Sequence, residues 1–417
     1  MIMPGSENVL GQLIRQAMQG CWGGVDGKRN VNTSMVVRLA DFLLKRAITL
    51  RASDLHLEPQ ADGMKVRYRV DGLLKQEDQI LPAQLAGFLV SRLKVMAGMD
   101  IAQHQKPQDG HIGFSLTDRV IDIRTSSMPT VHGEMMVCRF MNIEEKLLCI
   151  SELGFSPENQ QRFVDLISRP AGMVIVCGPV NNGKTTTLYA AMQALNTPEY
   201  NLVTLEDPVE HTLSGINQVQ INPKGGLDYV AGLKSLLRQD TDRILLGEIR
   251  SGDTAEMAVR IALTGHLLLT TLHTEDAVAA VFRLREMGVP AYLIAATLTG
   301  VVAQRLVRRC CPDCQEIYEV KAGSPEAAML GSVWQPGLKL KRNRGCNHCC
   351  GSGYRGRLAL QEVLAVTPTI RAAILQELDR QHLQQLAERE GLKTIWEDGI
   401  AKVLSGESTL AELKRVV

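Results

Sequence analysis

The fold of this chain is decided by the stretch Gly178-Pro179-Val180-Asn181-Asn182-Gly183-Lys184-Thr185. This stretch satisfies the pattern G-x-x-x-x-G-K-S/T of a phosphate-binding loop. An apolar run over residues 173–177 precedes it, and a helical pattern that begins at Thr186 follows it. Backbone N–H groups of such a loop and of the helix N-terminus bind phosphates, because they present aligned donors and the positive end of a dipole. The sequence therefore predicts a nucleotide site between a buried strand and a helix.

The residues of this loop receive separate expected roles. Lys184 would neutralise charge on the β and γ phosphates, and the Thr185 hydroxyl would hold Mg²⁺. We expect nucleotide contacts from Gly178, Pro179, Val180, Asn181, Asn182, Gly183, Lys184, Thr185 and Thr186. A glycine turn with an incidental lysine is the competing interpretation, and the strand and helix patterns on either side disfavour it.

Acidic and histidine side chains follow the other strands that the sequence predicts. Short apolar runs alternate with helical segments in this part of the chain, which predicts a parallel sheet covered by helices on both faces. The expected strands are residues 173–177, 201–205, 244–247 and 267–271. Ligands of such sheets gather beyond the carboxyl ends of the strands. The polar residues at those ends are Glu206, Asp207, Glu210, Glu248 and His273.

These strand-end residues fit the needs of phosphoryl transfer to water. The reaction needs a carboxylate that orients the metal and a group that positions the water. Any one carboxylate could instead be a helix cap or a solvated charge, but acids and a histidine at successive strand ends are harder to explain in that way. We therefore take Glu210, Glu248 and His273, with Lys184, as candidate catalytic residues.

A cluster of cysteines lies nearer the C-terminus. Two C-x-x-C pairs, Cys311 with Cys314 and Cys346 with Cys349, are separated by a stretch that can fold back as a hairpin. This spacing predicts a tetrahedral zinc site, and four thiolates leave no open position for a substrate, so the zinc would be structural. A redox role is a weaker interpretation, because a thioredoxin-like site needs one pair. Additional candidate ligands are Cys310, Cys350 and His348.

Charge and composition limit the classes of protein to which this chain can belong. The 46 basic and 45 acidic side chains almost balance, so nucleic acid is not an expected partner. The longest charge-free stretch, residues 287–304, contains proline, glycine and threonine, and we expect a buried helix there rather than a membrane span. No secretory signal pattern is visible near the N-terminus, so we expect the protein to stay in the cytoplasm.

The length of 417 residues exceeds what one hydrophobic core usually organises, which predicts two or three domains. Residues 1–30 show little periodicity and are expected to form a lead-in. Alternating patterns predict a small α+β domain over residues 31–145, followed by a hinge at 146–151. Residues 152–417 form the expected nucleotide-binding domain, which includes a tetracysteine zinc subdomain at 306–358 and a helical C-terminus.

Further motifs accompany the phosphate loop, and together they are more specific than any one of them. They are Ala52-Ser53-Asp54-Leu55-His56-Leu57-Glu58-Pro59, Pro107-Gln108-Asp109-Gly110, Glu206-Asp207-Pro208-Val209-Glu210, Gly247-Glu248-Ile249-Arg250, Leu263-Thr264-Gly265-His266 and Leu272-His273-Thr274. Through these motifs the chain resembles the secretion and type IV pilus traffic ATPases. The paired cysteines are typical of the assembly branch, which includes the type II secretion ATPase.

The resemblance implies an architecture, cofactors and partners. The fold class would be α/β, with a RecA-like P-loop NTPase domain preceded by a small PAS-like α+β domain and ATP bound between the two. The protein would form a homohexamer that hydrolyses ATP and drives an inner-membrane platform protein of a pilus or secretion system. It would lie in the cytoplasm and associate peripherally with the inner membrane through its partners. The expected cofactors are ATP, Mg²⁺ and Zn²⁺.

The resemblance also implies roles for individual residues. Glu210 would position or activate the water, and Glu248 would hold Mg²⁺ or its water. Glu206 belongs to the same acidic motif as Glu210 and is expected to bind the nucleotide. Arg124 and Arg139 match family arginines that reach the phosphates, whereas from the residues alone they are only arginines at the ends of predicted strands.

The chain departs from the family pattern inside the phosphate loop. The family loop usually reads Gly-Pro-Thr-Gly-Ser-Gly-Lys, and Val180, Asn181 and Asn182 replace its three central residues. Asparagine is the non-glycine residue best able to adopt a positive φ, so Asn181 can preserve the backbone at a modest cost. The departure motivates an alternative function, a nucleotide-binding regulatory or scaffold subunit with weak or no turnover.

Overall fold

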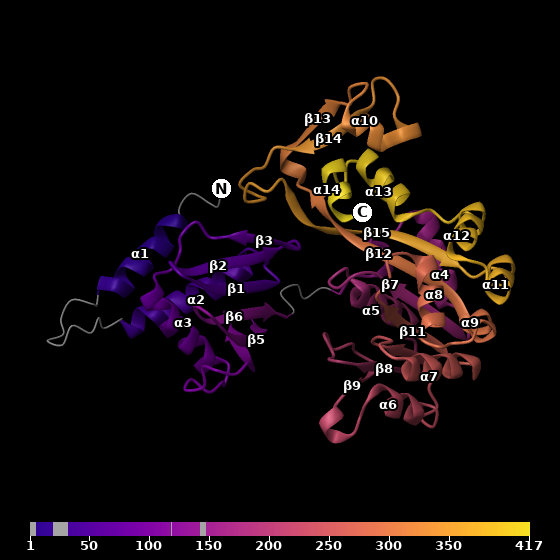
Figure 1. Ribbon diagram of the computed structural model, residues 1–417, viewed down its shortest axis with the longest axis horizontal. Helices are drawn as coiled ribbons and strands as arrows, with labels where there is room; N and C mark the ends of the chain where they lie inside the picture. Colours follow the sequence, from indigo (N-terminus) through magenta and orange to yellow (C-terminus); the bar gives the residue numbers. More distant parts are fainter. Residues whose placement is uncertain (1–5, 20–31, 118, 142–146) are drawn as a thin grey trace. The chain divides into compact units, whose positions relative to one another are not determined.

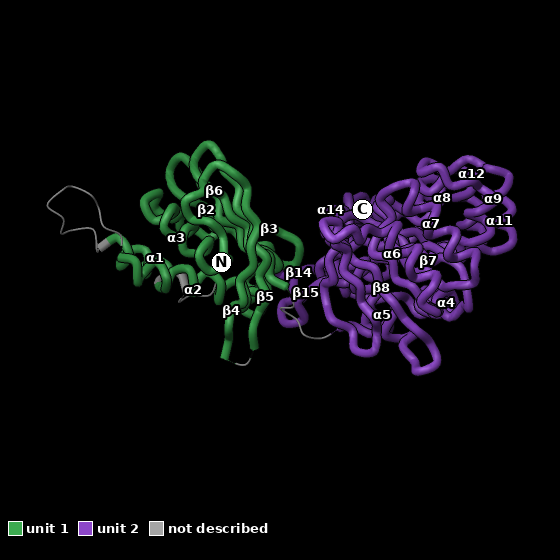
Figure 2. Tube along the Cα trace, turned by 90° about the horizontal axis from the view of Figure 1, so that it is seen from below, with its two compact units in different colours: residues 1–145, 345–352 green, residues 146–344, 353–417 purple. Residues whose placement is uncertain are grey.

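The computed structural model describes residues 6–19, 32–117, 119–141 and 147–417. The chain forms two compact units, residues 1–145 with 345–352 and residues 146–344 with 353–417 (Figure 2). The glycine-rich part of the expected lead-in and the first residue of the expected hinge lie outside the described residues. No helix within the described ranges is long and apolar enough to cross a membrane.

The first unit is built on a six-stranded antiparallel sheet in the order β3-β2-β1-β6-β5-β4 (Figure 1). Its strands are β1 (Asp54–Gln60), β2 (Gly63–Val70), β3 (Leu73–Gln76), β4 (Gln108–Ser115), β5 (Val120–Thr130) and β6 (Gly133–Phe140). Buried positions alternate with more exposed ones along β1, so one face of the sheet is apolar. The helices α2 (Thr33–Thr49) and α3 (Ala83–Met96) pack on the sheet, which confirms the α+β class of this unit.

The helix α1 (Ser6–Gln19) differs from the lead-in that the sequence analysis expected. Leu10, Leu13 and Ala17 are buried, and their spacing puts them on one face of the helix. This face packs against α2, so the helix belongs to the core of the first unit. The stripe is only two turns long, which is why the sequence pattern alone did not reveal it.

The second unit contains a seven-stranded sheet in the order β15-β12-β7-β11-β10-β8-β9 (Figure 1). All neighbours pair in parallel except β15, which is antiparallel to β12. The strands are β7 (Gly172–Cys177), β8 (Leu202–Glu206), β9 (Asn217–Gln220), β10 (Arg243–Leu246), β11 (Leu267–Leu272), β12 (Leu298–Cys310) and β15 (Tyr354–Ala365). The parallel sheet and the four strands expected from the sequence are therefore confirmed, with small differences at their ends.

Helices cover both faces of this sheet, as predicted. Along β7, Met173 and Ile175 enter one core with α7 and α8, whereas Val174 and Val176 enter another with α4 and α5. The helices of this unit are α4 (Pro157–Ile167), α5 (Lys184–Leu195), α6 (Tyr229–Leu236), α7 (Gly252–Leu263), α8 (Ala277–Glu286), α9 (Ala291–Thr297), α10 (Pro325–Leu330), α11 (Pro368–Leu375), α12 (Arg380–Arg389), α13 (Ile395–Leu404) and α14 (Leu410–Val416). The last four confirm the expected helical C-terminus.

The single buried helix expected over residues 287–304 is wrong. The stretch contains the short helix α9, in which Ile294, Ala295 and Thr297 are buried, and the first half of β12, which is buried throughout. A strand buried on both faces is apolar throughout, so its sequence cannot be distinguished from a buried helix by periodicity. Gly300 lies in this part of β12, where an added Cβ would lie 2.4 Å from a methyl carbon of Leu166, so the close packing of the strand against α4 requires glycine.

Short elements complete the second unit. The strands β13 (Gln315–Glu319) and β14 (Lys339–Asn343) form a two-stranded antiparallel sheet near the cysteines. Single 3-10 turns are η1 (Ile150–Glu152), η2 (Pro223–Gly225), η3 (Pro312–Cys314) and η4 (Gly331–Val333).

Candidate nucleotide site and cysteine cluster

The phosphate loop joins β7 to α5, as the sequence predicts. Gly178 has a φ of 147°, and an added Cβ would lie 2.3 Å from the backbone oxygen of Gln304, so the site requires glycine. Asn181 has a φ of 63° and Gly183 a φ of 75°. Asparagine tolerates this left-handed conformation better than most side chains. The loop therefore keeps a backbone with positive φ at the position where the family has a glycine.

Asn182 ties the loop to the neighbouring strand β12. Its side-chain oxygen accepts a hydrogen bond from the backbone N–H of Leu306 at 2.7 Å, and its amide nitrogen donates to the Val180 carbonyl at 3.2 Å. The Gln304 amide donates to the backbone oxygen of Asn182 at 2.6 Å and accepts from the Thr187 hydroxyl at 2.9 Å. The atypical residues thus take part in a hydrogen-bond network that spans the loop, β12 and α5.

Lys184 is folded back on the loop. Its ammonium group donates to the carbonyls of Gly178 and Pro179 at 2.9 and 2.8 Å and lies 3.5 Å from Nδ1 of His273. Burial lowers the pKa of Lys184, and the nearby Glu248 carboxylate acts in the opposite direction. A phosphate oxygen could replace the two carbonyls as the acceptor for this ammonium group. Thr185 lies in the first turn of α5, next to it.

The strand ends bring further charged groups to the same edge of the sheet. Glu248 follows β10, and its carboxylate lies 3.5 Å from Nε2 of His273, which follows β11. Arg250 forms an ion pair with Glu248 and lies 3.8 Å from Asp207. The structure therefore brings Lys184, His273 and Glu248 together in a contact chain, in which the His273 ring touches Lys184 through Nδ1 and Glu248 through Nε2. Arg250 was in a recognised motif, but the sequence did not indicate its pairing with Glu248.

The two glutamates of the acidic motif occupy different environments. Glu206 is 3% exposed, and its carboxylate accepts hydrogen bonds from Tyr189, from Thr204 at 2.5 Å and from Gln218 at 3.1 Å. Glu210 is exposed. The surroundings of Glu206 favour a role in holding the acidic loop rather than the direct nucleotide contact that we expected. Tyr189 and Gln218 carried no sequence signal, because their partners are distant along the chain.

The two family arginines lie in the first unit. Arg124 and Arg139 are opposite each other on the neighbouring strands β5 and β6. Arg139 Nε lies 2.9 Å from a carboxylate oxygen of Asp54, which is 3% exposed. Arg69 lies 3.6 Å from the same carboxylate group. Asp54 therefore holds Arg139 at the surface of the sheet, a contact that the sequence analysis did not identify.

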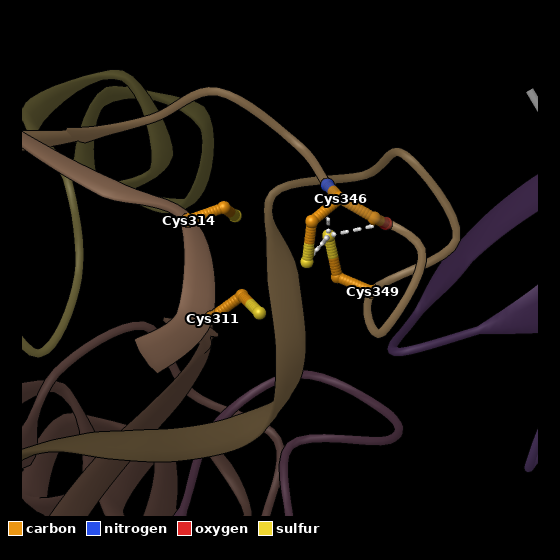
Figure 3. A group of neighbouring side chains, drawn as sticks. All are labelled: Cys311, Cys314, Cys346 and Cys349. Carbon is orange, nitrogen blue, oxygen red and sulfur yellow. Dashed lines mark hydrogen bonds between the residues drawn. The ribbon is translucent and has the colours of Figure 1, made fainter.

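The four predicted cysteines gather in one cluster (Figure 3). The sulfur atoms of Cys311, Cys314, Cys346 and Cys349 all lie within 4.8 Å of one another. Those of Cys346 and Cys349 are 3.7 Å apart. A tetrahedral zinc with Zn–S bonds of about 2.3 Å separates its sulfurs by roughly 3.8 Å, so the donor set fits zinc.

Backbone hydrogen bonds hold the two cysteine segments in place. The N–H of Arg344 donates to the Cys314 carbonyl at 3.0 Å, and the N–H of Cys311 donates to the Gly353 carbonyl at 2.9 Å. Both ends of the loop at 345–352 are thereby fixed beside the first cysteine pair. Of the additional candidates, His348 forms a second possible group with Cys311 and Asp313, whereas no group found among the described residues includes Cys310 or Cys350.

A phosphate loop at the end of a central parallel strand, with Glu248 and His273 at the next strand ends, defines a P-loop ATPase. The chain belongs to the family described as Type II/IV secretion system protein, whose model matches residues 29–415.

Individual relatives agree with this assignment. The chain is 42% identical to the type II secretion system ATPase E of Vibrio cholerae, over 91% of this chain and 75% of the relative. It is also 42% identical to the type IV pilus assembly ATPase PilB of Acinetobacter baylyi, over 91% of this chain and 66% of the relative. The X-ray structure of the ATPase DotB of Legionella pneumophila has a similar fold, with a TM-score of 0.66, 20% identity and coverage of 94% of this chain and 97% of that one.

Proposed function

We propose that this protein hydrolyses ATP to power type II protein secretion or type IV pilus assembly. The observation that carries the proposal is the contact chain of Lys184, His273 and Glu248 beside the phosphate loop. The names of the Vibrio cholerae and Acinetobacter baylyi relatives support the two candidate pathways.

We assign a separate role in hydrolysis to each residue of the site. Lys184 and the loop N–H groups bind the phosphates, and the Thr185 hydroxyl and Glu248 carboxylate are oxygen ligands of the kind that Mg²⁺ prefers. Bound Mg²⁺ would neutralise charge on the β and γ phosphates. Glu210 orients the attacking water from the acidic loop, and Arg124 and Arg139 add positive charge from the first unit.

The working assembly that we propose is a homohexamer that acts on an inner-membrane platform protein. The protein would associate peripherally with the membrane through that partner. The alternative of a scaffold subunit without turnover rested on the unusual centre of the phosphate loop. The positive φ of Asn181 and the network around Asn182 support a phosphate-binding backbone in this loop, which both functions require. The contacts of His273 with Lys184 and Glu248 support turnover.

Phosphate release from Mg²⁺-ATP by the purified protein tests this function. The Lys184→Ala variant should abolish release, because it removes the ammonium group that would neutralise charge on the β and γ phosphates. Lys224→Ala is the matched control, since Lys224 is an exposed lysine in η2, which follows the edge strand β9, whereas the loop follows the inner strand β7. A wild-type protein that releases no more phosphate than Lys184→Ala, even with its membrane partner, would contradict the proposal.

We also propose that the four clustered cysteines bind one structural zinc ion. Support comes from the sulfur separations and from the backbone bonds that fix both cysteine segments. Four thiolates would saturate the ion, so it would stabilise the two cysteine segments without a direct part in hydrolysis.

A further inference from the structure

Tyr189 is a buried residue to which the proposed mechanism assigns no role. It is the sixth residue of α5, the helix that begins at Lys184, and it is 1% exposed. Its hydroxyl group donates a hydrogen bond to the Glu206 carboxylate. The same oxygen accepts from the backbone N–H of Glu210 at 3.2 Å and lies 3.5 Å from the N–H of His211. One side chain thus connects the phosphate-loop helix with the loop that carries Glu210.

The surroundings hold this hydroxyl group in one orientation. The Tyr189 ring packs edge-on against the His211 ring, with centroids 6.2 Å apart. The Glu206 carboxylate is itself fixed by Thr204 and Gln218, so the acceptor of the tyrosine proton does not move freely. Burial and the Glu206 carboxylate raise the pKa of Tyr189, so the hydroxyl group keeps its proton and donates.

We propose that Tyr189 is a positioning residue for ATP hydrolysis, because its hydroxyl group sets the place of Glu210 relative to the phosphate loop. This inference rests on the proposed function, in which Glu210 orients the water. The helix is the rigid part of the link, and five residues from Lys184 to Tyr189 span about 7.5 Å along its axis. A displacement of the phosphate-loop helix is therefore passed to the Glu210 backbone through the hydrogen bond of the Tyr189 hydroxyl group.

A packing role alone would need only the tyrosine ring. The ring contributes to the core formed by α4, α5 and the sheet, and phenylalanine would fill the same space. The hydroxyl group is the part that reaches Glu206, Glu210 and His211. The Tyr189→Phe variant therefore removes the proposed link and keeps the packing.

Steady-state hydrolysis by Tyr189→Phe is the main test. We expect kcat to fall by about tenfold to a hundredfold, since a misplaced reacting group costs rates of this order. The KM for ATP should stay within about twofold, because the phosphate-binding residues are unchanged and a general loss of structure would alter both constants. Tyr200→Phe is the control, because Tyr200 is half exposed and packs its ring on Arg243, outside this network.

Amide hydrogen exchange tests the link without any need for turnover. The N–H groups of Glu210 and His211 should be protected in the wild-type protein, and Tyr189→Phe should lose this protection while β7 keeps its own. Rapid exchange of the Glu210 amide in the wild-type protein would overturn the inference even if the variant did not fold. If the wild type is active and Tyr189→Phe has the same kcat, the inference about Tyr189 is also overturned, but the proposed function stands. An inactive wild type with the expected exchange pattern would contradict the proposed function instead.

Discussion

Replacement of Asn182 by alanine should weaken ATP binding, because this side chain connects the phosphate loop to β12. The change removes the acceptor for the Leu306 N–H and the donor to the Val180 carbonyl. Each hydrogen bond contributes about 0.5 to 1.5 kcal/mol net. Because Asn182 and Leu306 are only partly buried, we expect the variant to lose about 1 to 2 kcal/mol of the free energy that stabilises the ordered loop over the disordered one.

This loss converts directly into apparent affinity for the nucleotide. A loop that must be ordered before it binds phosphate loses affinity in proportion to its ordered fraction. A free-energy change of about 1 to 2 kcal/mol alters the ratio of ordered to disordered loop by roughly 5 to 30-fold, and the ordered fraction falls by this full factor where the disordered form is the major one in the free protein. We therefore expect the KM for ATP and the Kd of a fluorescent ATP analogue to rise by about fivefold or more, with a kcat close to that of the wild type.

The matched control for this prediction is Asn181→Gly in the same loop. Glycine adopts the observed φ of 63° without strain, so this variant should keep the KM within about twofold of the wild-type value. Circular dichroism and thermal melting establish that both variants are folded. A folded Asn182→Ala protein whose KM and Kd stay within twofold of the wild type would refute the idea that this network orders the loop.

Two other predictions concern the metal and the pH dependence of stability. Elemental analysis of protein purified without chelator should find about one zinc per chain, and a wild type with far less than one zinc would contradict the site. The Cys346→Ser variant should lose the zinc and melt at a lower temperature. The Cys149→Ser control, at an exposed cysteine outside the cluster, should keep the metal. Burial raises the pKa of Glu362 to about 7, although the N–H groups of Ala277 and Ile395 bind its carboxylate. The folded state then holds this proton at a pH where the unfolded chain has released it, so stability should fall as pH rises from about 4.5 through 7. Urea unfolding should show this fall in the wild type and a flatter profile in Glu362→Gln, and equal slopes for the two proteins would contradict the assignment.

Local patterns explain which parts of the fold were predictable. The phosphate loop combines a glycine pattern, an apolar strand and a helix start within one short stretch, and the structure has the same order. The buried strands β7, β10 and β11 were recognisable because short apolar runs end in polar residues. The cysteine cluster was predictable from spacing, since two C-x-x-C pairs need only a connecting excursion to meet.

The errors also have physical causes. The stripe of Leu10, Leu13 and Ala17 is too short for periodicity to separate a helix from a loop, and only its packing on α2 makes the helix evident. The stretch at 287–304 is apolar on all sides, so its division into α9 and β12 depends on the pairing of β12 with β7 and β15. Neither decision can be read from neighbouring residues along the chain.

The amino-acid sequence by itself determined the class of this protein, the position of its phosphate loop and the composition of its cysteine cluster, because each depends on residues close together in the chain. The tertiary structure alone decided how the atypical loop is held and how its surroundings are arranged. Gln304 and Leu306 meet Asn182 across 122 and 124 residues of chain, and Tyr189 meets Glu206 and Glu210 from a different element. Such contacts arise from the order of strands in the sheet, which brings distant segments to one edge, and no local pattern encodes them.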